Sequence, residues 1–449
     1  MGAKMNIIVR LIVLLLAAIG VAAIVDYSDV YDVPMIEVSK QNEPLAVTPS
    51  AQAEEFGGHG FSQEGLDRIQ VMMETAIQDG RIMSAIAMVA RDGEIAWIGT
   101  AGEMSPGIPM RNDAIIPLAS VGKMFTATAA MILYERGVIS LNDPVSKFIP
   151  EFANVKVAVT NEAGETGLVE PQNPVTIYHM LTHTGGLKVT GDDFWTVRGA
   201  HVARTTTTEF ARALAELPLQ SQPGAEFNYG VTGASYEVLA AVIETVSGMT
   251  LETFMADNIF EPLGLDDTYF YVPEEKSERM PAFYRKENGE LQLERAYGED
   301  FPRTTYFHGG GGVRSAPGDI SRFARLFLEG GAVDGVRILS PETIQLMISD
   351  HLGEKSTFQG FNGELSWGFG AAVLIKDRLS EDGVLKQYGW VGGNYAKLWI
   401  DPSEKIVAYF AFTLTPPGDI ALLFEFDPLV YAAMTESYID PSTTLTEVH

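Results

Sequence analysis

The sequence of 449 residues contains no cysteine. This absence excludes disulfides, thiolate nucleophiles, cysteine-ligated zinc, iron–sulfur clusters and a lipid-modified N-terminal cysteine. Basic residues are also scarce, because 31 Lys and Arg stand against 59 Asp and Glu and give a formal net charge of −28. Such a charge repels phosphate backbones and anionic lipid surfaces, so we expect no nucleic-acid partner. With 46% hydrophobic residues, the chain can still bury a sizeable core.

The apolar run that stands out lies at the N-terminus. Lys4 and Arg10 precede an apolar segment at residues 11–25, a pattern typical of an export signal. The run is long for a signal peptide and short for a membrane span, and Gly20 and Ala22 offer only an imperfect cleavage site. We therefore expect an exported protein, periplasmic, secreted or held at the outer face of the cytoplasmic membrane, with residues 1–25 as a cleaved signal peptide or a membrane tether.

The remaining chain reads as one large catalytic unit with two flanking segments. Residues 26–60 carry prolines, acidic residues and a glycine pair without a sustained period, which predicts a linker. We expect the folded domain over residues 61–435 and a C-terminal tail over 436–449. The sequence does not indicate an oligomeric state.

Strand patterns lie at both ends of the folded domain, with helical patterns between them. Strand-like runs at 82–90 and 94–101 flank a short glycine-containing turn, which predicts a hairpin. Further strand-like runs occur at 368–375, 384–391, 395–401 and 405–412, and helical spacing occurs at 65–79, 121–136, 235–247, 316–329 and 419–435. This order predicts an α+β fold in which one antiparallel sheet is completed by sequence-distant segments.

Ser120 and Lys123 form an S-x-x-K motif where one of the helical patterns begins. A serine hydroxyl is a weak nucleophile near neutral pH, and a lysine three residues later presents its amine on the same helix face. Such a lysine acts as a base only when burial or a nearby cation lowers its pKa. A chain of this length contains about one such motif by chance, so the motif alone favours a helix cap beside a surface lysine over a catalytic pair.

Other motifs carry weaker signals. His179 and His183 have the spacing of two zinc ligands on a helix, but the glutamate of H-E-x-x-H and a third ligand are missing, so we expect a loop or core role. The glycine run 309–312 is not followed by G-K-[ST], which favours an architectural role over phosphate binding. No G-x-S-x-G motif occurs, which argues against an α/β-hydrolase.

Five blocks of sequence share a resemblance to one superfamily. The blocks at 115–152, 175–187, 223–230, 260–270 and 309–331 resemble, in family order, the serine β-lactamase and penicillin-binding-protein superfamily, especially its class C and family VIII carboxylesterase branch. The resemblance covers roughly residues 61 to 414. It implies a β-lactamase/transpeptidase-like fold, with an antiparallel sheet flanked by helices, a helical subdomain and an active site in the cleft between them. It implies no metal or cofactor.

The resemblance also implies roles for individual residues. Tyr229 matches the tyrosine of the family's Tyr-x-Asn element, where the phenol exchanges protons with nucleophile and leaving group, whereas Val231 replaces the asparagine. Trp390 and Gly392 match the third element, Lys-Thr-Gly in β-lactamases and often Trp-x-Gly in the esterase-like relatives. Gly393 is then expected to form the oxyanion hole together with the N–H of Ser120.

Departures from the family pattern bear on the substrate. Trp390 removes a cation that would hold a substrate carboxylate, and Val231 removes a contact to the side-chain amide of β-lactams and peptides. Relatives often carry Gly-Thr where this chain has Tyr395 and Ala396, so we expect a pocket of different shape. These differences favour a carboxylesterase acting through an acyl-enzyme on small uncharged esters.

Three other readings of the sequence stay open. A D,D-peptidase or β-lactamase would act on cell-wall peptides or β-lactams and become acylated by penicillin. A catalytically inactive binding module of the cell envelope would retain ligand without turnover. A membrane-tethered adaptor would bind a partner without using the cleft.

Overall fold

The computed structural model describes residues 54–55, 58–187, 206–229, 234–287, 290–300, 302–353, 358–359, 363–377, 387–415 and 419–438. The predicted leader, most of the predicted linker and Val231 lie outside these residues. The chain divides into two compact units. Among the described residues, the first unit, here called the helical unit, lies within Gly137–Leu251 and Thr304–Gly310, and the second, the sheet unit, lies within Val33–Arg136, Glu252–Arg303 and Gly311–His449.

The sheet unit is built on one antiparallel sheet, to which the described residues contribute ten strands. The strand order is β1-β3-β2-β18-β17-β16-β15-β14-β13, and β4 pairs with β3. The β18–β2 pair, in register from Ile406 opposite Arg91 to Phe412 opposite Ala85, joins the two ends of the chain, as the sequence predicted. The strands are β1 (Glu54–Glu55), β2 (Ser84–Arg91), β3 (Glu94–Ser105), β4 (Ile108–Pro109), β13 (Phe358–Gln359), β14 (Gly363–Trp367), β15 (Ala372–Asp377), β16 (Tyr388–Val391), β17 (Lys397–Asp401) and β18 (Ile406–Phe412).

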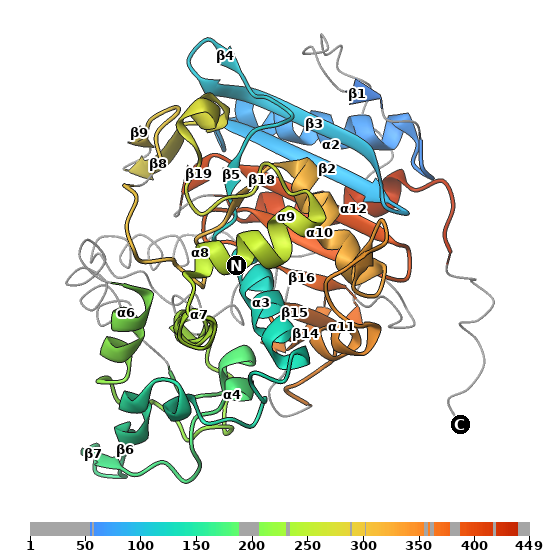
Figure 1. The fold of residues 1–449 in the computed structure, drawn as a ribbon. Helices are drawn as coiled ribbons and strands as arrows, with labels where there is room; N and C mark the ends of the chain where they lie inside the picture. Colours follow the sequence, from blue (N-terminus) through green and yellow to red (C-terminus); the bar gives the residue numbers. More distant parts are fainter. Residues whose placement is uncertain are drawn as a thin grey trace. The chain divides into compact units, whose positions relative to one another are not determined.

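Helices cover both faces of this sheet (Figure 1). Helices α2 (Gln63–Gln78) and α12 (Ala421–Ala433) pack together on one face, where they bury a core that includes Trp97, Trp399 and Phe410. On the other face, α10 (Pro317–Leu328) contacts β2, β3, β17 and β18. Helix α3 (Lys123–Glu135) joins α10 through the stacked rings of Phe125 and Phe323, 3.7 Å between centroids. We call these the α2/α12 face and the α10 face.

Short elements complete the sheet unit. Strand β5 (Ile116–Pro117) pairs with β10 (Arg314–Ser315) and leads into the 3₁₀ turn η2 (Ala119–Gly122) that precedes α3. The others are α8 (Leu251–Met255), the π-helix η5 (Ala256–Phe260), α9 (Glu261–Leu263), η6 (Glu274–Arg279), α11 (Pro341–Met347), the pair β11 (Ala332–Val333) and β12 (Val336–Arg337), and the three strands β8 (Phe283–Glu287), β9 (Glu290–Arg295) and β19 (Leu414–Thr415).

The helical unit is organised around α7 (Ala234–Ser247), whose first ten residues are all buried. A helix that is apolar on every side is expected at the centre of a packed unit. Its other elements are η3 (Val145–Lys147), η4 (Pro150–Asn154), the hairpin β6 (Val157–Thr160) and β7 (Thr166–Val169), α4 (Ile177–Leu181) and α6 (Thr207–Leu214). Within the described ranges, no unbroken helix has the length and apolar character of a membrane span, although a pair bent by 79°, Ala234–Ser247 with Leu251–Leu263, meets the same criteria.

The two ends of the described sheet unit are hydrogen-bonded to each other. The N–H of Thr435 donates to the carbonyl of Gly60, and the N–H of Ser62 donates to the carbonyl of Ala433, both at 2.8 Å. The fully buried guanidinium of Arg91 binds the carboxylate of Glu404 at 2.7 Å, and its cation lies 4.1 Å from the ring centroid of Tyr438. Ordered contacts therefore extend on both sides of the predicted boundaries at 61 and 435.

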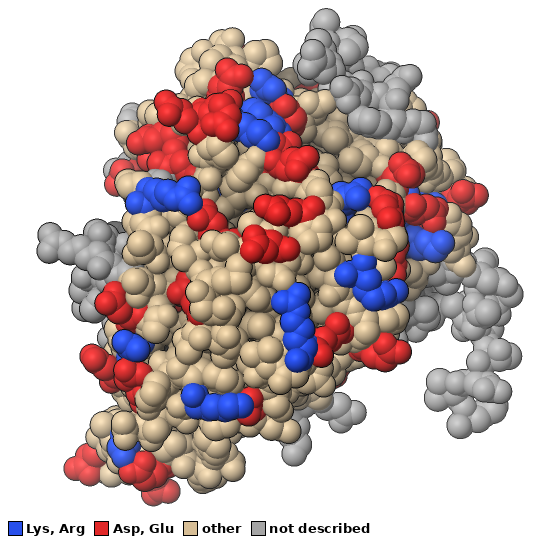
Figure 2. Space-filling view, viewed as in Figure 1, with Lys and Arg blue, Asp and Glu red and all other residues tan. Residues whose placement is uncertain are grey.

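Acidic side chains are spread over the face drawn in Figure 2. Lys and Arg stand singly or beside carboxylates there, and the described residues form no continuous basic area on this face. This distribution is in keeping with the net charge of −28.

Candidate active site

Ser120 and Lys123 lie in direct contact in the sheet unit. Ser120 is part of the turn η2, and Lys123 is the first residue of α3. The Lys123 Nζ donates a hydrogen bond to the Ser120 Oγ at 2.9 Å, and the lysine side chain is fully buried. Side chains three residues apart eclipse each other in a 3₁₀ turn, which brings the amine over the hydroxyl. The separation is short enough for direct proton transfer between the two groups.

The backbone that precedes Ser120 is strained and tightly held. Ala119 has a φ of +45°, in the left-handed region that costs a residue with a Cβ about 1–2 kcal/mol. The N–H of Leu118 donates to the carbonyl of Val313 at 2.8 Å, in the ribbon formed by β5 and β10. A side chain at Gly311 would come within 2.8 Å of the Ala119 backbone. This part of the glycine run therefore permits a close approach to residues 117–120, here called the nucleophile segment because Ser120 is the predicted nucleophile. This is the architectural role expected for the run.

The buried guanidinium of Arg314 also holds the glycine run in place. Its Nη1 donates to the carbonyls of Gly312 and Phe270, each at 2.5 Å, and its Nη2 binds the carboxylate of Asp300 at 2.7 Å. Because the charge is paired and each nitrogen has an acceptor, these interactions offset the cost of burying the guanidinium, which can then hold two loops together.

The turn between β16 and β17 packs against the nucleophile segment. Strand β16 contacts η2, and a side chain at Gly392 would lie 2.5 Å from the carbonyl oxygen of Leu118 and 3.0 Å from the Cβ of Ala119. The side-chain amide of Asn394 donates to the carbonyl of Pro117. The structure thus brings two segments that are about 270 residues apart in sequence into contact beside Ser120.

Two backbone donors are available in these segments. Within the described residues, neither the N–H of Ser120 nor the N–H of Gly393 has a hydrogen-bond acceptor. Gly393 is exposed, and a side chain there would meet nothing within 4 Å. Donors of this kind can stabilise an oxyanion, and their convergence on one carbonyl oxygen stays a prediction.

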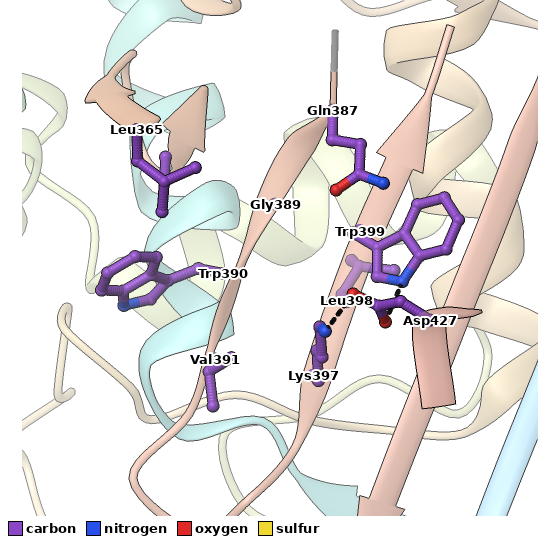
Figure 3. A pocket seen from close by; sticks show the side chains of 10 residues that line it. Leu365, Gln387, Gly389, Trp390, Val391, Lys397, Leu398, Trp399 and Asp427 are labelled. Atoms are coloured by element: carbon purple, nitrogen blue, oxygen red, sulfur yellow. Dashed lines mark hydrogen bonds and ion pairs between the residues drawn. The ribbon is translucent and has the colours of Figure 1, made fainter. Parts of the chain in front are cut away.

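Trp390 lines a pocket along β16 (Figure 3). Its ring meets Trp367 edge to face, 4.8 Å between centroids, and Leu365, Ala372 and Leu398 contribute further apolar wall. In the antiparallel register, Trp390 lies opposite Leu398, whereas Val391 lies opposite Lys397. Because alternate residues of a strand point to opposite faces, Trp390 and Lys397 occupy different faces of the sheet.

Lys397 is a second buried lysine, and its charge is matched by a carboxylate. Its Nζ pairs with Asp427 of α12 and donates to the carbonyl of Leu423 at 3.1 Å, while the indole N–H of Trp399 donates to Asp427 at 2.7 Å (Figure 3). Complete burial lowers the pKa of Lys397 despite this carboxylate. The pair joins β17 to α12. It does not take the place of the lysine that β-lactamases carry at the position of Trp390.

Tyr395 lies in the β16–β17 turn, and its side chain is part of the core. It has a φ of +61°, and its ring stacks on Phe412, 4.8 Å between centroids, within the core of the α2/α12 face. The expectation of a pocket of different shape at Tyr395 and Ala396 stays a prediction.

Tyr229 belongs to the helical unit, where it is half-buried at the end of a described segment. Its ring lies 4.7 Å from that of His183, and the N–H of the preceding Asn228 donates to the carbonyl of His183 at 2.8 Å. Its approach to Ser120 stays a prediction.

A buried carboxylate organises the start of the glycine run in the helical unit. Glu237 of α7 accepts hydrogen bonds from the N–H of Gly310 at 2.9 Å, the N–H of Gly309 at 3.2 Å and the phenol of Tyr306 at 2.8 Å. These bonds support the structural role predicted for the run. The described side chains form no group of three or more His, Asp or Glu suited to a metal ion.

The Beta-lactamase family model matches residues 68–428, which include the contact of Ser120 with Lys123 and the β16–β17 turn. The chain belongs to the beta-lactamase family. This family comprises serine hydrolases, so the chain is an enzyme of that class.

Relatives of the beta-lactamase family match most of the chain. Protein Rv1367c of Mycobacterium tuberculosis is 29% identical over 371 residues, 78% of this chain and 90% of the relative. Esterase EstB of Burkholderia gladioli is 28% identical over 369 residues, 74% of this chain and 86% of the relative. The solved structure of EstCE1, a hydrolase with promiscuous acyltransferase activity, covers 83% of this chain and 99% of its own, with a TM-score of 0.67 and 24% identity. The fold is the beta-lactamase/transpeptidase-like α+β fold that the resemblance implied.

Two residues that support the Ser120 segment and the glycine run were missed at the level of sequence. Asn394 bonds to the carbonyl of Pro117 and Arg314 to the carbonyl of Phe270, and because both partners are distant in sequence, no local pattern marks these contacts. The glycine pair before Asn394 was the one available signal, because paired glycines often mark a close approach of two chain segments.

Proposed function

We propose that this member of the beta-lactamase family is a carboxylesterase-type hydrolase that forms an acyl-enzyme on Ser120. The observation that carries the proposal is the hydrogen bond of 2.9 Å between the fully buried Lys123 Nζ and the Ser120 Oγ. A serine held against a buried amine is the arrangement expected for an activated hydroxyl nucleophile.

The proposed reaction has two halves. The Ser120 Oγ attacks the ester carbonyl while its proton passes to the Lys123 and Tyr229 pair, and the N–H groups of Ser120 and Gly393 stabilise the oxyanion. Collapse of the tetrahedral intermediate breaks the bond between the carbonyl carbon and the alkoxy oxygen of the ester, and the leaving alcohol takes up the proton. Water then attacks the acyl-enzyme with proton transfer in the reverse sense, which releases the carboxylic acid and regenerates the hydroxyl.

The chemistry of the pocket favours an uncharged substrate. Trp390 presents an apolar wall with Leu365 and Leu398, and the cation of Lys397, which also lines this pocket, is paired with Asp427. An apolar wall without an available cation binds a neutral acyl or alkoxy group more favourably than a carboxylate. The relative named Esterase EstB supports the same preference.

Transfer of the acyl group to an alcohol instead of water is a second candidate function. The structural neighbour EstCE1 is described as a hydrolase with promiscuous acyltransferase activity. In acyl transfer, an alcohol replaces water in the second half of the reaction and leaves as a new ester. A small primary alcohol added to the assay would then divert product from acid to ester at constant total turnover.

The deciding experiment is intact-mass analysis after treatment with a fluorophosphonate and, separately, with a penicillin. The esterase proposal expects a fluorophosphonate adduct on the wild type, no adduct on Ser120→Ala, and hydrolysis of short p-nitrophenyl esters by the wild type only. A stable or slowly lost penicillin adduct on Ser120 would favour the D,D-peptidase or β-lactamase alternative. An absence of both adducts, with ligand still bound by Ser120→Ala, would favour the inactive binding module.

An exported location forms part of the proposal and is supported by the N-terminal pattern of Lys4, Arg10 and the apolar run at 11–25. N-terminal sequencing of protein from the membrane and soluble fractions distinguishes the tether from the cleaved peptide. A mature N-terminus shortly after Ala22, in the soluble fraction, would identify a cleaved leader.

A further inference from the structure

His183 occupies an unusual position in the helical unit. It follows α4 directly, has a φ of +55° and is 1% exposed. Left-handed backbone is uncommon outside glycine, although histidine adopts it more often than most residues, and it persists only where the surroundings determine it. The strain therefore points to a side-chain direction that the fold maintains.

The neighbouring threonines hold this backbone in place. The hydroxyl of Thr182 bonds to the carbonyl of Tyr178 and to the hydroxyl of Thr184, each at 2.8 Å. The N–H of Thr184 donates to the carbonyl of His179 at 2.9 Å. His183 is thus fixed by hydrogen bonds on both sides in sequence.

The segment that ends at Tyr229 is hydrogen-bonded along this same stretch of backbone. The N–H groups of Gln220, Gly224 and Asn228 donate to the carbonyls of Gly186, Thr184 and His183 at 2.8, 2.7 and 2.8 Å. The last of these bonds fixes the residue just before Tyr229. A rigid loop with successive main-chain bonds can position a side chain more accurately than an unsupported loop.

The imidazole of His183 adds a second point of contact. Its ring lies 4.7 Å from the Tyr229 ring and 5.0 Å from the ring of Tyr236 in α7, which is anchored by its own bond of 2.9 Å to the carbonyl of Leu181. The imidazole therefore contacts both an anchored aromatic ring and the Tyr229 ring. One residue thereby contacts the Tyr229 ring and accepts the main-chain bond just before Tyr229.

We propose that His183 is a positioning residue for the catalytic Tyr229, acting through ring contact and through the bond to Asn228. The inference rests on the proposed function, because it assumes that the Tyr229 phenol transfers protons at Ser120. It assigns His183 neither direct contact with substrate nor a metal. It differs from simple core packing in one measurable respect, since its effect on turnover depends on the Tyr229 hydroxyl.

The test is a double-mutant cycle on ester hydrolysis with His183→Ala, Tyr229→Phe and the combined variant. We expect His183→Ala to lower kcat by about 10- to 100-fold with little change in KM, as a small misplacement of a catalytic group does. In the Tyr229→Phe background, the same substitution is expected to change kcat less than about twofold, because the hydroxyl it positions is gone.

Two further variants separate the ring contact from backbone strain and from stability. His183→Asn tolerates a positive φ but removes the ring, so it is expected to remain folded and to lose activity like His183→Ala. His179→Ala is the matched control, because it removes the capping box of α4 without touching Tyr229, and kcat should stay near the wild-type value. If His183→Ala fails to fold, the cycle is run with His183→Asn.

The outcomes are distinguishable. Equal losses from the His183 substitution in both Tyr229 backgrounds, or full activity of His183→Asn, would overturn the positioning role while leaving the proposed function intact. Wild-type kcat for Tyr229→Phe would instead refute the catalytic role of Tyr229, and the positioning role with it.

Discussion

Two lysines are buried among the described residues, and their partners differ. Lys123 donates to the hydroxyl of Ser120, whereas Lys397 pairs with the carboxylate of Asp427. Both belong to the sheet unit. Lys397 is the first residue of β17, directly after the β16–β17 turn that contacts the nucleophile segment.

The hydrogen-bond partner of a buried amine, more than its burial, decides whether the amine serves in proton transfer or in stability. A carboxylate favours the protonated amine and makes the pair a structural element, in which the loss of one partner leaves the other buried without compensation. A hydroxyl at 2.9 Å gives the amine a group with which a proton can be exchanged. We therefore expect substitutions of the two lysines to separate turnover from stability.

The largest effect is expected from Lys123→Met. The variant removes the proposed base while keeping most of the side-chain volume, so kcat/KM for an ester should fall by about 10²- to 10⁴-fold. Because Met leaves no buried charge behind, the melting temperature should not fall greatly. Steady-state kinetics and the rate of fluorophosphonate labelling measure the loss. Activity within tenfold of wild type would remove Lys123 from the mechanism.

Lys397→Met should act on stability instead. It leaves Asp427 buried without its cation, which costs about 3–5 kcal/mol in the free energy of unfolding. In the double variant Lys397→Met/Asp427→Asn, the amide oxygen can still accept from Trp399, so much of the loss should be recovered. Denaturant melts and kcat are compared for all three proteins. A stable Lys397→Met enzyme with activity as low as Lys123→Met would erase the contrast between the two lysines.

Asp319 tests the complementary case of a half-buried carboxyl that has no ammonium partner among the described residues. Burial raises its pKa to about 6, although one oxygen accepts hydrogen bonds from the N–H of Asp267 at 2.7 Å and the hydroxyl of Thr268 at 2.8 Å. The native state then holds the proton more tightly than the unfolded chain, so this group's contribution to stability falls as pH rises from about 4 to about 6.

Asp319→Asn removes this pH dependence and keeps an oxygen for both hydrogen bonds. The stability of the wild type relative to the variant should decrease by up to about 3 kcal/mol between pH 3.5 and pH 7. Denaturant melts of both proteins across that range give the difference directly. A difference that is flat with pH would contradict the raised pKa.

The smallest effect is expected from Asn394→Ala, which cuts the side-chain bond between the β16–β17 turn and Pro117. The proposed oxyanion donor at Gly393 would be placed less precisely, and kcat/KM should fall about tenfold, with a stability loss of about 1 kcal/mol. Asn161→Ala is a suitable control, because that side chain closes only its own turn in the β6–β7 hairpin. Equal kinetic effects from both variants would argue against a special role for Asn394.

Much of the fold could be predicted from periodicity. The spacing at 65–79 and 121–136 corresponds to α2 (Gln63–Gln78) and α3 (Lys123–Glu135), and the hairpin at 82–101 corresponds to β2 and β3. These are long segments with a continuous apolar stripe or run, which local pattern describes well. Strand β14 was missed, because its five residues are stabilised by pairing with β15 and carry too short a pattern of their own.

The active site could be predicted only where its chemistry is local in sequence. Ser120 and Lys123 are three residues apart, so one motif captures both and the structure places them in contact. The supporting residues depend on tertiary structure, as in the bond from Asn394 to Pro117. Backbone strain at Ala119 and Tyr395 was also hidden, since neither residue is of a type that favours a positive φ.

The hydrogen bonds that join Gly60 to Thr435 and Ser62 to Ala433 give the sheet unit an almost ring-like connectivity. Where two ends lie this close, a short peptide can link them and new ends can be opened at an exposed turn, such as the one from Asn161 to Gly164. A circularly permuted chain of this kind would separate the predicted leader from the segment that carries Ser120 and leave the order of the sheet unchanged.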